Sequence, residues 1–170
     1  AVTRSGTNDF SGSFVWDRTS DDWRAPTPRE ELEGKSPERT EQYGVAFGGP
    51  IIRDRLHFFI SYEAKDFIVP EFVAGPANTD FITFPPEVLA EYGPTSRPFN
   101  QDVYFGKLSW QASDAHLIEF SARVREEVGI LDVGGINAPS AGTALNNNEK
   151  RYDLRSVYSA TNWMNDAHIT

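Results

Sequence analysis

Two apolar runs, residues 47–52 and 56–64, are separated by only three residues, Arg53-Asp54-Arg55. Three residues form only a tight connection, so the two runs are predicted to be neighbouring antiparallel strands. In a strand, residues two apart point to the same side. The second run therefore has a mostly polar face and an apolar face, and the apolar face carries Phe58, Ile60, Tyr62 and Ala64.

The same alternation recurs along the chain and predicts an all-β fold, an antiparallel up-and-down meander of about six strands. The strands are expected at residues 9–18, 41–52, 56–66, 102–111, 116–126 and 150–163, and Asn165 begins a further turn. Long connections (20–40, 67–100 and 128–148) alternate with short turns, and residues 86–93 read as a short helix in the second of them. Strands of about ten residues with long loops at one end and tight turns at the other are typical of outer-membrane β-barrels. We therefore predict a segment of a large transmembrane barrel.

The aromatic residues sort by height along the predicted strands. If the short turns lie at the bottom, one group falls near the upper strand ends: Trp16, Tyr43, Tyr62, Tyr104 and Tyr152. A second group, Phe10, Phe58 and Trp110, falls near the lower ends. Trp and Tyr prefer the boundary between hydrocarbon and water, so the two groups are predicted to mark the two membrane interfaces.

The alternation also assigns a side to each strand residue. Phe14, Ile60, Phe120 and Leu154 are predicted to face lipid. Ser13, Ser61, Glu119 and Arg155 are predicted to face the barrel lumen. Such an open set of strands is expected to expose a large apolar surface unless other chain segments complete it.

Composition excludes several other classes of protein. The 170 residues carry a net charge of −9, which argues against a nucleic-acid surface, since such a surface needs clustered Lys and Arg. Without cysteine, neither a disulfide framework nor a thiolate metal site can form. The sequence contains no run of about 18 apolar residues, so no transmembrane helix is predicted. Residues 1–6 do not resemble a signal peptide.

No pattern of residues predicts catalysis. His57, His116 and His168 lie near different turns without a carboxylate at ligand spacing, so surface histidines are favoured over a metal site. The acidic group Asp17, Asp21 and Asp22 lacks the fixed spacing of a calcium loop. We therefore expect no enzymatic activity, no catalytic residue, no metal and no cofactor.

Three stretches resemble a known family. Residues 2–13 resemble the segment where the plug joins the barrel in TonB-dependent outer-membrane receptors, most closely in the Oar-like branch. Residues 43–63 resemble the second and third barrel strands of that branch, and residues 107–117 its fourth strand and following turn. The resemblance implies that residues 1–8 are a plug-to-barrel junction and residues 9–170 the first strands of a barrel of about 22 strands.

The resemblance further implies a location and partners. Such a receptor sits in the outer membrane of a Gram-negative bacterium and imports a bulky solute, which its loops and plug capture and TonB releases by pulling on the plug. The expected partners are outer-membrane lipid, the receptor's own plug domain, the TonB system and the solute, with no nucleic acid. The motifs that couple to TonB are absent from these 170 residues, which are expected to be one piece of the receptor.

The long loops are the predicted place of solute binding. Residues 67–100 are aromatic-rich, and Phe72, Phe81, Phe84 and Tyr92 are predicted to contact substrate. Alternatively, the rings of this segment, which also include Phe67 and Phe99, pack against one another and stiffen the loop. A charged strip on the last two strands has the same two interpretations, as ordinary lumen pairs or as a contact surface for plug or substrate: Glu119, Arg123, Arg125, Arg151, Asp153 and Arg155. The competing hypothesis for the whole chain is a small non-transporting barrel or a soluble β-sheet module that binds a ligand or protein.

Overall fold

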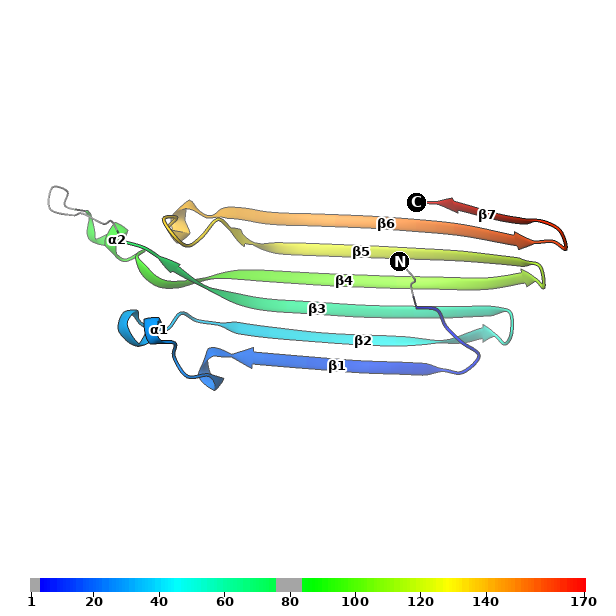
Figure 1. Cartoon of the computed structure of the whole chain (residues 1–170), viewed down its shortest axis with the longest axis horizontal. Coiled ribbons are helices and arrows are strands. Elements are labelled where there is room, and N and C mark those ends of the chain that lie inside the picture. Colours follow the sequence, from blue (N-terminus) through cyan, green and yellow to red (C-terminus); the bar gives the residue numbers. More distant parts are fainter. Residues whose placement is uncertain (1–3, 76–83) are drawn as a thin grey trace.

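The structure, a computed structural model, describes residues 4–75 and 84–170. Within these ranges, seven strands form one antiparallel sheet in the order in which they follow along the chain (Figure 1). The strands are β1 (Ser11–Ser20), β2 (Arg39–Ile52), β3 (Leu56–Val73), β4 (Gly93–Ser113), β5 (His116–Leu131), β6 (Thr143–Ser159) and β7 (Met164–Ile169). This up-and-down meander confirms the predicted fold class.

The sheet contains one strand more than the sequence predicted. Asn165, expected to begin a turn, instead pairs with Tyr158 in the ladder between β6 and β7. The turn lies just before it and is closed by a backbone hydrogen bond from Ala160 N–H to the Trp163 carbonyl (2.8 Å). The prediction was wrong because Asn and Asp are common in turns, whereas here pairing with β6 decides their conformation.

The strands also run further toward the long connections than predicted. The connections span residues 21–38, 74–92 and 132–142 rather than 20–40, 67–100 and 128–148. The predicted bounds were wrong because proline was taken to indicate a loop, whereas Pro70, Pro94 and Pro98 lie inside β3 and β4. All three lie beyond the last residues that pair with β2 or β5, so one side of each strand needs no N–H donor there.

Short helices occupy the long connections. They are η1 (Asp21–Trp23), α1 (Pro28–Glu33), α2 (Pro86–Leu89) and η2 (Pro139–Ala141). Helix α2 starts at the proline where the sequence predicted a helix. No helix in the described part of the chain is long and apolar enough to cross a membrane.

The tight turns gather at the opposite end of the sheet, as predicted (Figure 1). Between β2 and β3, Asp54 adopts a positive φ of 62°, and the Arg55 N–H donates to the Ile52 carbonyl (3.1 Å). A three-residue hairpin loop commonly needs such a residue, and Asp is one of the few types that adopt this conformation readily. Between β4 and β5, Ser113 pairs with His116, which leaves a two-residue turn.

The sheet has almost no interior. Among the described residues, the buried apolar side chains are Ala64, Val73 and Val133. The chain exposes 11516 Å² of surface, whereas a compact monomer of 19.0 kDa exposes about 8,400 Å². The sheet therefore depends on other surfaces to cover its faces and edges.

The segment before β1 lies across one face of the sheet, near the tight turns (Figure 1). This is the polar face, because Ser5 lines a hollow there together with charged residues such as Lys107 and Glu119. Gly6 rests directly on the β2–β3 backbone, where a Cβ atom would collide with the Phe58 carbonyl oxygen. Beside it, Gly48 presents no side chain, which leaves room for Gly6. Asn8 then binds the turn: its side-chain oxygen accepts from the Asp54 N–H (2.8 Å) and lies 2.8 Å from His57 Nε2.

Candidate functional site

One face of the sheet carries the predicted interface aromatics, and pairing between strands places them side by side. Trp16 lies opposite Tyr43, and Tyr62 lies opposite Tyr104. The ring centroids of Tyr62 are 6.0 Å from Tyr43 and 4.9 Å from Tyr104. Together with Tyr152 on β6, these rings form a line across the sheet toward its long-loop end, which we call the upper belt. Trp16, Tyr43, Tyr104 and Tyr152 are exposed in this chain, and Tyr62, between two neighbouring rings, is partly exposed.

The upper belt crosses the strands at a slant. The row of paired residues that starts at Trp16 on β1 reaches Asn148 on β6, whereas the belt reaches Tyr152. Over these five strand pairs, the belt therefore moves four residues toward the tight turns. At about 3.3 Å per residue and about 4.8 Å per strand, the belt deviates by about 30° from the line perpendicular to the strands. Strands of outer-membrane barrels tilt by roughly 35–45° from the membrane normal, so a belt in the membrane plane would cross them at nearly this angle.

A second group of rings, the lower belt, lies toward the tight turns on the same face. Phe10 stacks on Phe47 with 5.9 Å between ring centroids, and Phe58 contacts both rings. Trp110 continues the line on β4. The sequence prediction missed the end of this belt, where the Tyr158 and Trp163 rings lie 5.2 Å apart, because Trp163 was placed inside the sixth strand.

A row of charged residues borders the upper belt on the same face. On each of the first six strands, the first charged residue on this face, counted from the tight-turn end, directly follows an apolar or aromatic same-face residue; these charged residues are Arg18, Glu41, Asp66, Asp102, Glu126 and Lys150. The belt donates to this row: Trp16 Nε1–H to Glu41 Oε1 (3.3 Å) and Tyr62 O–H to Asp102 Oδ1 (2.6 Å). Tyr and Trp place their polar atoms in this way where an apolar layer meets water. The charged row therefore marks the upper limit of the apolar band.

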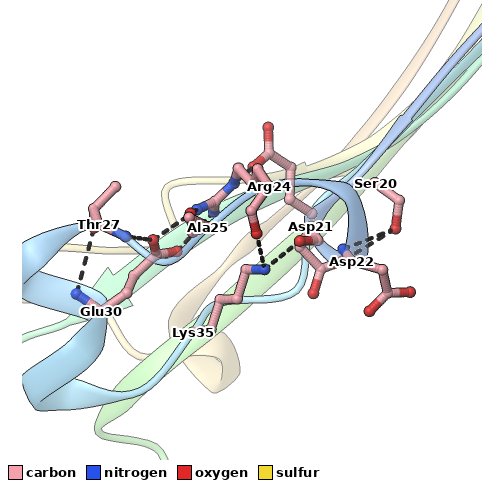
Figure 2. A network of polar contacts seen from close by, with 9 residues as sticks. Ser20, Asp21, Asp22, Arg24, Ala25, Thr27, Glu30 and Lys35 are labelled. Atoms are coloured by element: carbon pink, nitrogen blue, oxygen red, sulfur yellow. Dashed lines mark hydrogen bonds and ion pairs between the residues drawn. The ribbon is translucent and has the colours of Figure 1, made fainter.

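Beyond the charged row, the first long connection is held by a compact polar network (Figure 2). Both Arg24 Nη atoms donate to the Glu30 carboxylate at 2.7 Å, and Arg24 Nε donates to Glu38 (2.8 Å). Thr27 caps α1 through a reciprocal bond with Glu30. Lys35 closes the loop by donating to the backbone carbonyls of Asp21 and Arg24. Hydrogen bonds from Arg24 hold the pKa of the Glu30 carboxyl well below its usual range.

The network also joins this connection to its neighbours. The Ser36 hydroxyl donates to the Glu71 carbonyl (2.8 Å), and the Arg29 guanidinium lies 4.1 Å from the centre of the Phe72 ring. The end of β3 in turn exchanges backbone hydrogen bonds with Gly135 of the third connection. The second and third connections meet where Ser140 donates twice to Glu91, which lowers the pKa of that carboxyl. The described parts of the three connections thus form one surface, which we call the loop platform.

Comparison with known proteins agrees with this geometry. Residues 2–75, which include β1, β2 and β3, match the family model of an outer membrane beta barrel domain. This chain is part of an outer-membrane β-barrel. The protein therefore resides in the outer membrane of a Gram-negative bacterium. In barrels of this kind the apolar face is the one that contacts lipid, and the polar face lines the lumen. No curated protein and no solved structure matches the chain.

The predicted loop aromatics of this barrel segment occupy different settings. Phe72 lies at the end of β3 beneath Arg29, at a cavity of about 280 Å³ that Glu30 and Glu33 of α1 also line. Tyr92 lies beside Gly75, and Phe84 is partly exposed. Phe81 lies outside the described residues. No ring contact joins Phe72, Phe84 and Tyr92 to one another, and their role in binding stays a prediction.

Among the described rings of residues 67–100, one pair packs together. Phe67 and Phe99 pack with 6.1 Å between centroids, as a cross-strand pair between β3 and β4.

The residues that the sequence prediction missed are polar residues of the loop platform, Arg24, Lys35 and Glu38. The signal for the helix was present: Thr27 followed three residues later by Glu30, with Pro28 at the first helical position, is a capping-box pattern. Within the described residues, no group of His, Asp and Glu side chains is arranged to hold a metal ion.

The Arg24–Glu30 contact predicts how the first loop responds to pH. Because the folded state lowers the pKa of Glu30, the contact contributes stability above the ordinary Glu pKa of about 4.3 and loses it as the pH falls below that value. At low pH the first long connection should therefore be held less firmly. Arg24→Ala removes the same contact and should loosen this connection already at neutral pH. We expect faster amide hydrogen exchange at residues 24–36, measured by mass spectrometry, with unchanged exchange in β3 and β4.

The matched control is Glu31→Gln, an acidic residue of the same helix whose side chain makes no hydrogen bond or ion pair within the described part of the chain. Equal protection of the loop in Arg24→Ala and Glu31→Gln would contradict the assigned role of Arg24.

Proposed function

We propose that this chain is part of the wall of a TonB-dependent receptor of the Oar-like branch, which imports a bulky solute across the outer membrane. The observation that carries the proposal is the course of the segment before β1. Residues 4–8 lie on the lumenal face at the tight-turn end, against Gly48 and His57. A plug that fills a barrel and precedes its first strand must connect to that strand from inside the lumen. The resemblance of residues 2–13 to a plug-to-barrel junction agrees with this course.

The loop platform supplies part of the solute-capturing surface in this proposal. The Arg24 network and the hydrogen bonds between connections hold the loops in place, which limits the ordering cost of binding. Solute recognition then falls to exposed groups, with Phe72 and Arg29 at the cavity beside α1 as one available surface. The receptor performs no covalent chemistry and uses no cofactor. Its partners are outer-membrane lipid, its own plug, the TonB system and the solute.

Inspecting the parent reading frame upstream of Ala1 tests the receptor assignment directly. A plug-like sequence preceded by an energy-coupling box is the expected result. An upstream region without a plug would favour the competing hypothesis, a barrel that does not transport.

A second test addresses solute capture by the loops. Because Val73 pairs with Gly93, residues 75–92 are best replaced by an Asn-Gly turn rather than deleted outright. We expect the barrel to assemble, seen as heat-modifiable mobility on gels, while uptake falls strongly. Depletion of solutes from the growth medium can be compared by mass spectrometry between cells with the intact protein, the loop-replaced protein and inactive TonB.

The solute should be the compound whose depletion is lost in both altered strains. An assembled, loop-replaced barrel with unchanged depletion of every TonB-dependent solute would refute a capturing role for this loop.

A further inference from the structure

The lumenal faces of β5 and β6 place two arginines directly opposite each other. Arg123 and Arg151 are partners in the antiparallel ladder, and both point to the polar side of the sheet. Directly opposed side chains start only about 5 Å apart at Cβ, and like charges in such pairs are destabilising. The arrangement therefore calls for an anionic group near both guanidinium groups.

The chain's own carboxylates nearby are bound by other side chains, Arg151 among them, and none in the described residues forms an ion pair with Arg123. Glu119 pairs with Lys107 (2.7 Å) and lies 3.5 Å from Arg155. Asp153 accepts from Arg151 and from Thr170. Within the described residues, Arg123 makes no hydrogen bond or ion pair. Its electrostatic neighbour Glu127 is bound by Gln101 and Asn147.

A hollow lies in front of these two arginines. It has a volume of about 640 Å³ and is lined by four cationic side chains, Lys107, Arg123, Arg151 and Arg155, but by only two carboxylates, Glu119 and Asp153. With His168 neutral, the lining has a net charge of +2, although the whole chain has a net charge of −9. Ser5 of the segment before β1 borders the hollow, and Phe105 forms an apolar part of its floor.

We propose that Arg123 and Arg151 form a lumenal binding site for an anionic group, a carboxylate or a phosphate. Two guanidinium groups that line the same hollow offer several N–H donors to such an anion. The anion has one of two sources: a free solute that passes through the lumen, or a carboxylate of the protein that fills the lumen. The first source rests on the proposed uptake function; the second does not.

Titration of the complete protein in detergent at low ionic strength tests the site. Isothermal calorimetry with citrate and, separately, with inorganic phosphate provides the binding constants. If the anion is a free solute, the wild type binds a probe, and Arg123→Gln and Arg151→Gln weaken binding at least about tenfold, the loss expected for a charge-assisted hydrogen bond. Arg123→Lys should retain part of the affinity. The control Arg18→Gln removes the same charge from the outer face and should leave binding unchanged.

If the protein's own carboxylate fills the site, the wild type binds neither probe, but Arg123→Gln and Arg151→Gln lower the melting temperature, whereas Arg18→Gln does not. The proposal is overturned if neither probe binds and Arg123→Gln leaves the melting temperature unchanged or raises it by relieving the repulsion. It is also overturned if a probe binds equally well to the wild type and to both glutamine variants. None of these measurements depends on uptake, so a failure of the transport proposal would remain distinguishable.

Discussion

Ile60→Arg should lower the free energy of unfolding of the membrane-inserted barrel by about 2–4 kcal/mol, the cost of a charge at mid-height on the lipid face of a barrel. Ile60 lies between Phe58 of the lower belt and Tyr62 of the upper belt, and its side chain is 53% exposed in this chain. An arginine there replaces apolar contact with lipid by a guanidinium group that reaches neither membrane interface easily.

The adjacent residue provides the matched control. Ser61 points into the lumen beside Ala46 and Phe105, so Ser61→Arg should change the free energy of unfolding only mildly. Urea titration of the complete barrel in phospholipid vesicles, followed by tryptophan fluorescence, measures both variants. A larger loss for Ser61→Arg than for Ile60→Arg would reverse the assignment of the two faces.

The isolated chain of residues 1–170 should not form a stable monomer in water. Its lipid face exposes Phe14 (72%), Phe120 (43%) and Leu154 (45%). The unpaired edges of β1 and β7 offer free backbone groups to other chains. We expect aggregation after removal of denaturant in aqueous buffer and recovery of β structure in detergent micelles. A monodisperse monomer that unfolds cooperatively on heating in detergent-free buffer would contradict the lipid-facing assignment.

Much of the sheet could be predicted because strand structure leaves a local trace in the sequence. Alternation with a period of two separates Ile60 from Ser61 and Phe120 from Glu119 without any knowledge of their neighbours. The short turns could be predicted as well, since the three residues 53–55 between two strand patterns are too few for anything but a tight turn. The heights of Tyr62 and Trp110 followed from their distance to those turns.

The extent of the strands was less predictable because it depends on partners distant in the chain. Pro94 suggests a loop, yet β4 includes it because only the β3 side of the strand needs pairing at that height. Asn165 suggests a turn, yet it belongs to β7 because its backbone pairs with Tyr158. In both cases a local propensity of about 1 kcal/mol or less competes with a row of hydrogen bonds to the next strand.

The sequence by itself determined the fold class, the two faces and the positions of the tight turns, because each is set by residues close together in the chain. Only the tertiary structure decided which side chains meet across strands and loops. Register places Arg123 opposite Arg151 and Tyr62 opposite Tyr104, and loop folding brings Arg24 onto Glu30 and Glu38. The physical reason is that register is a property of the whole ladder, in which a shift of one residue would turn every side chain of a strand to the other face.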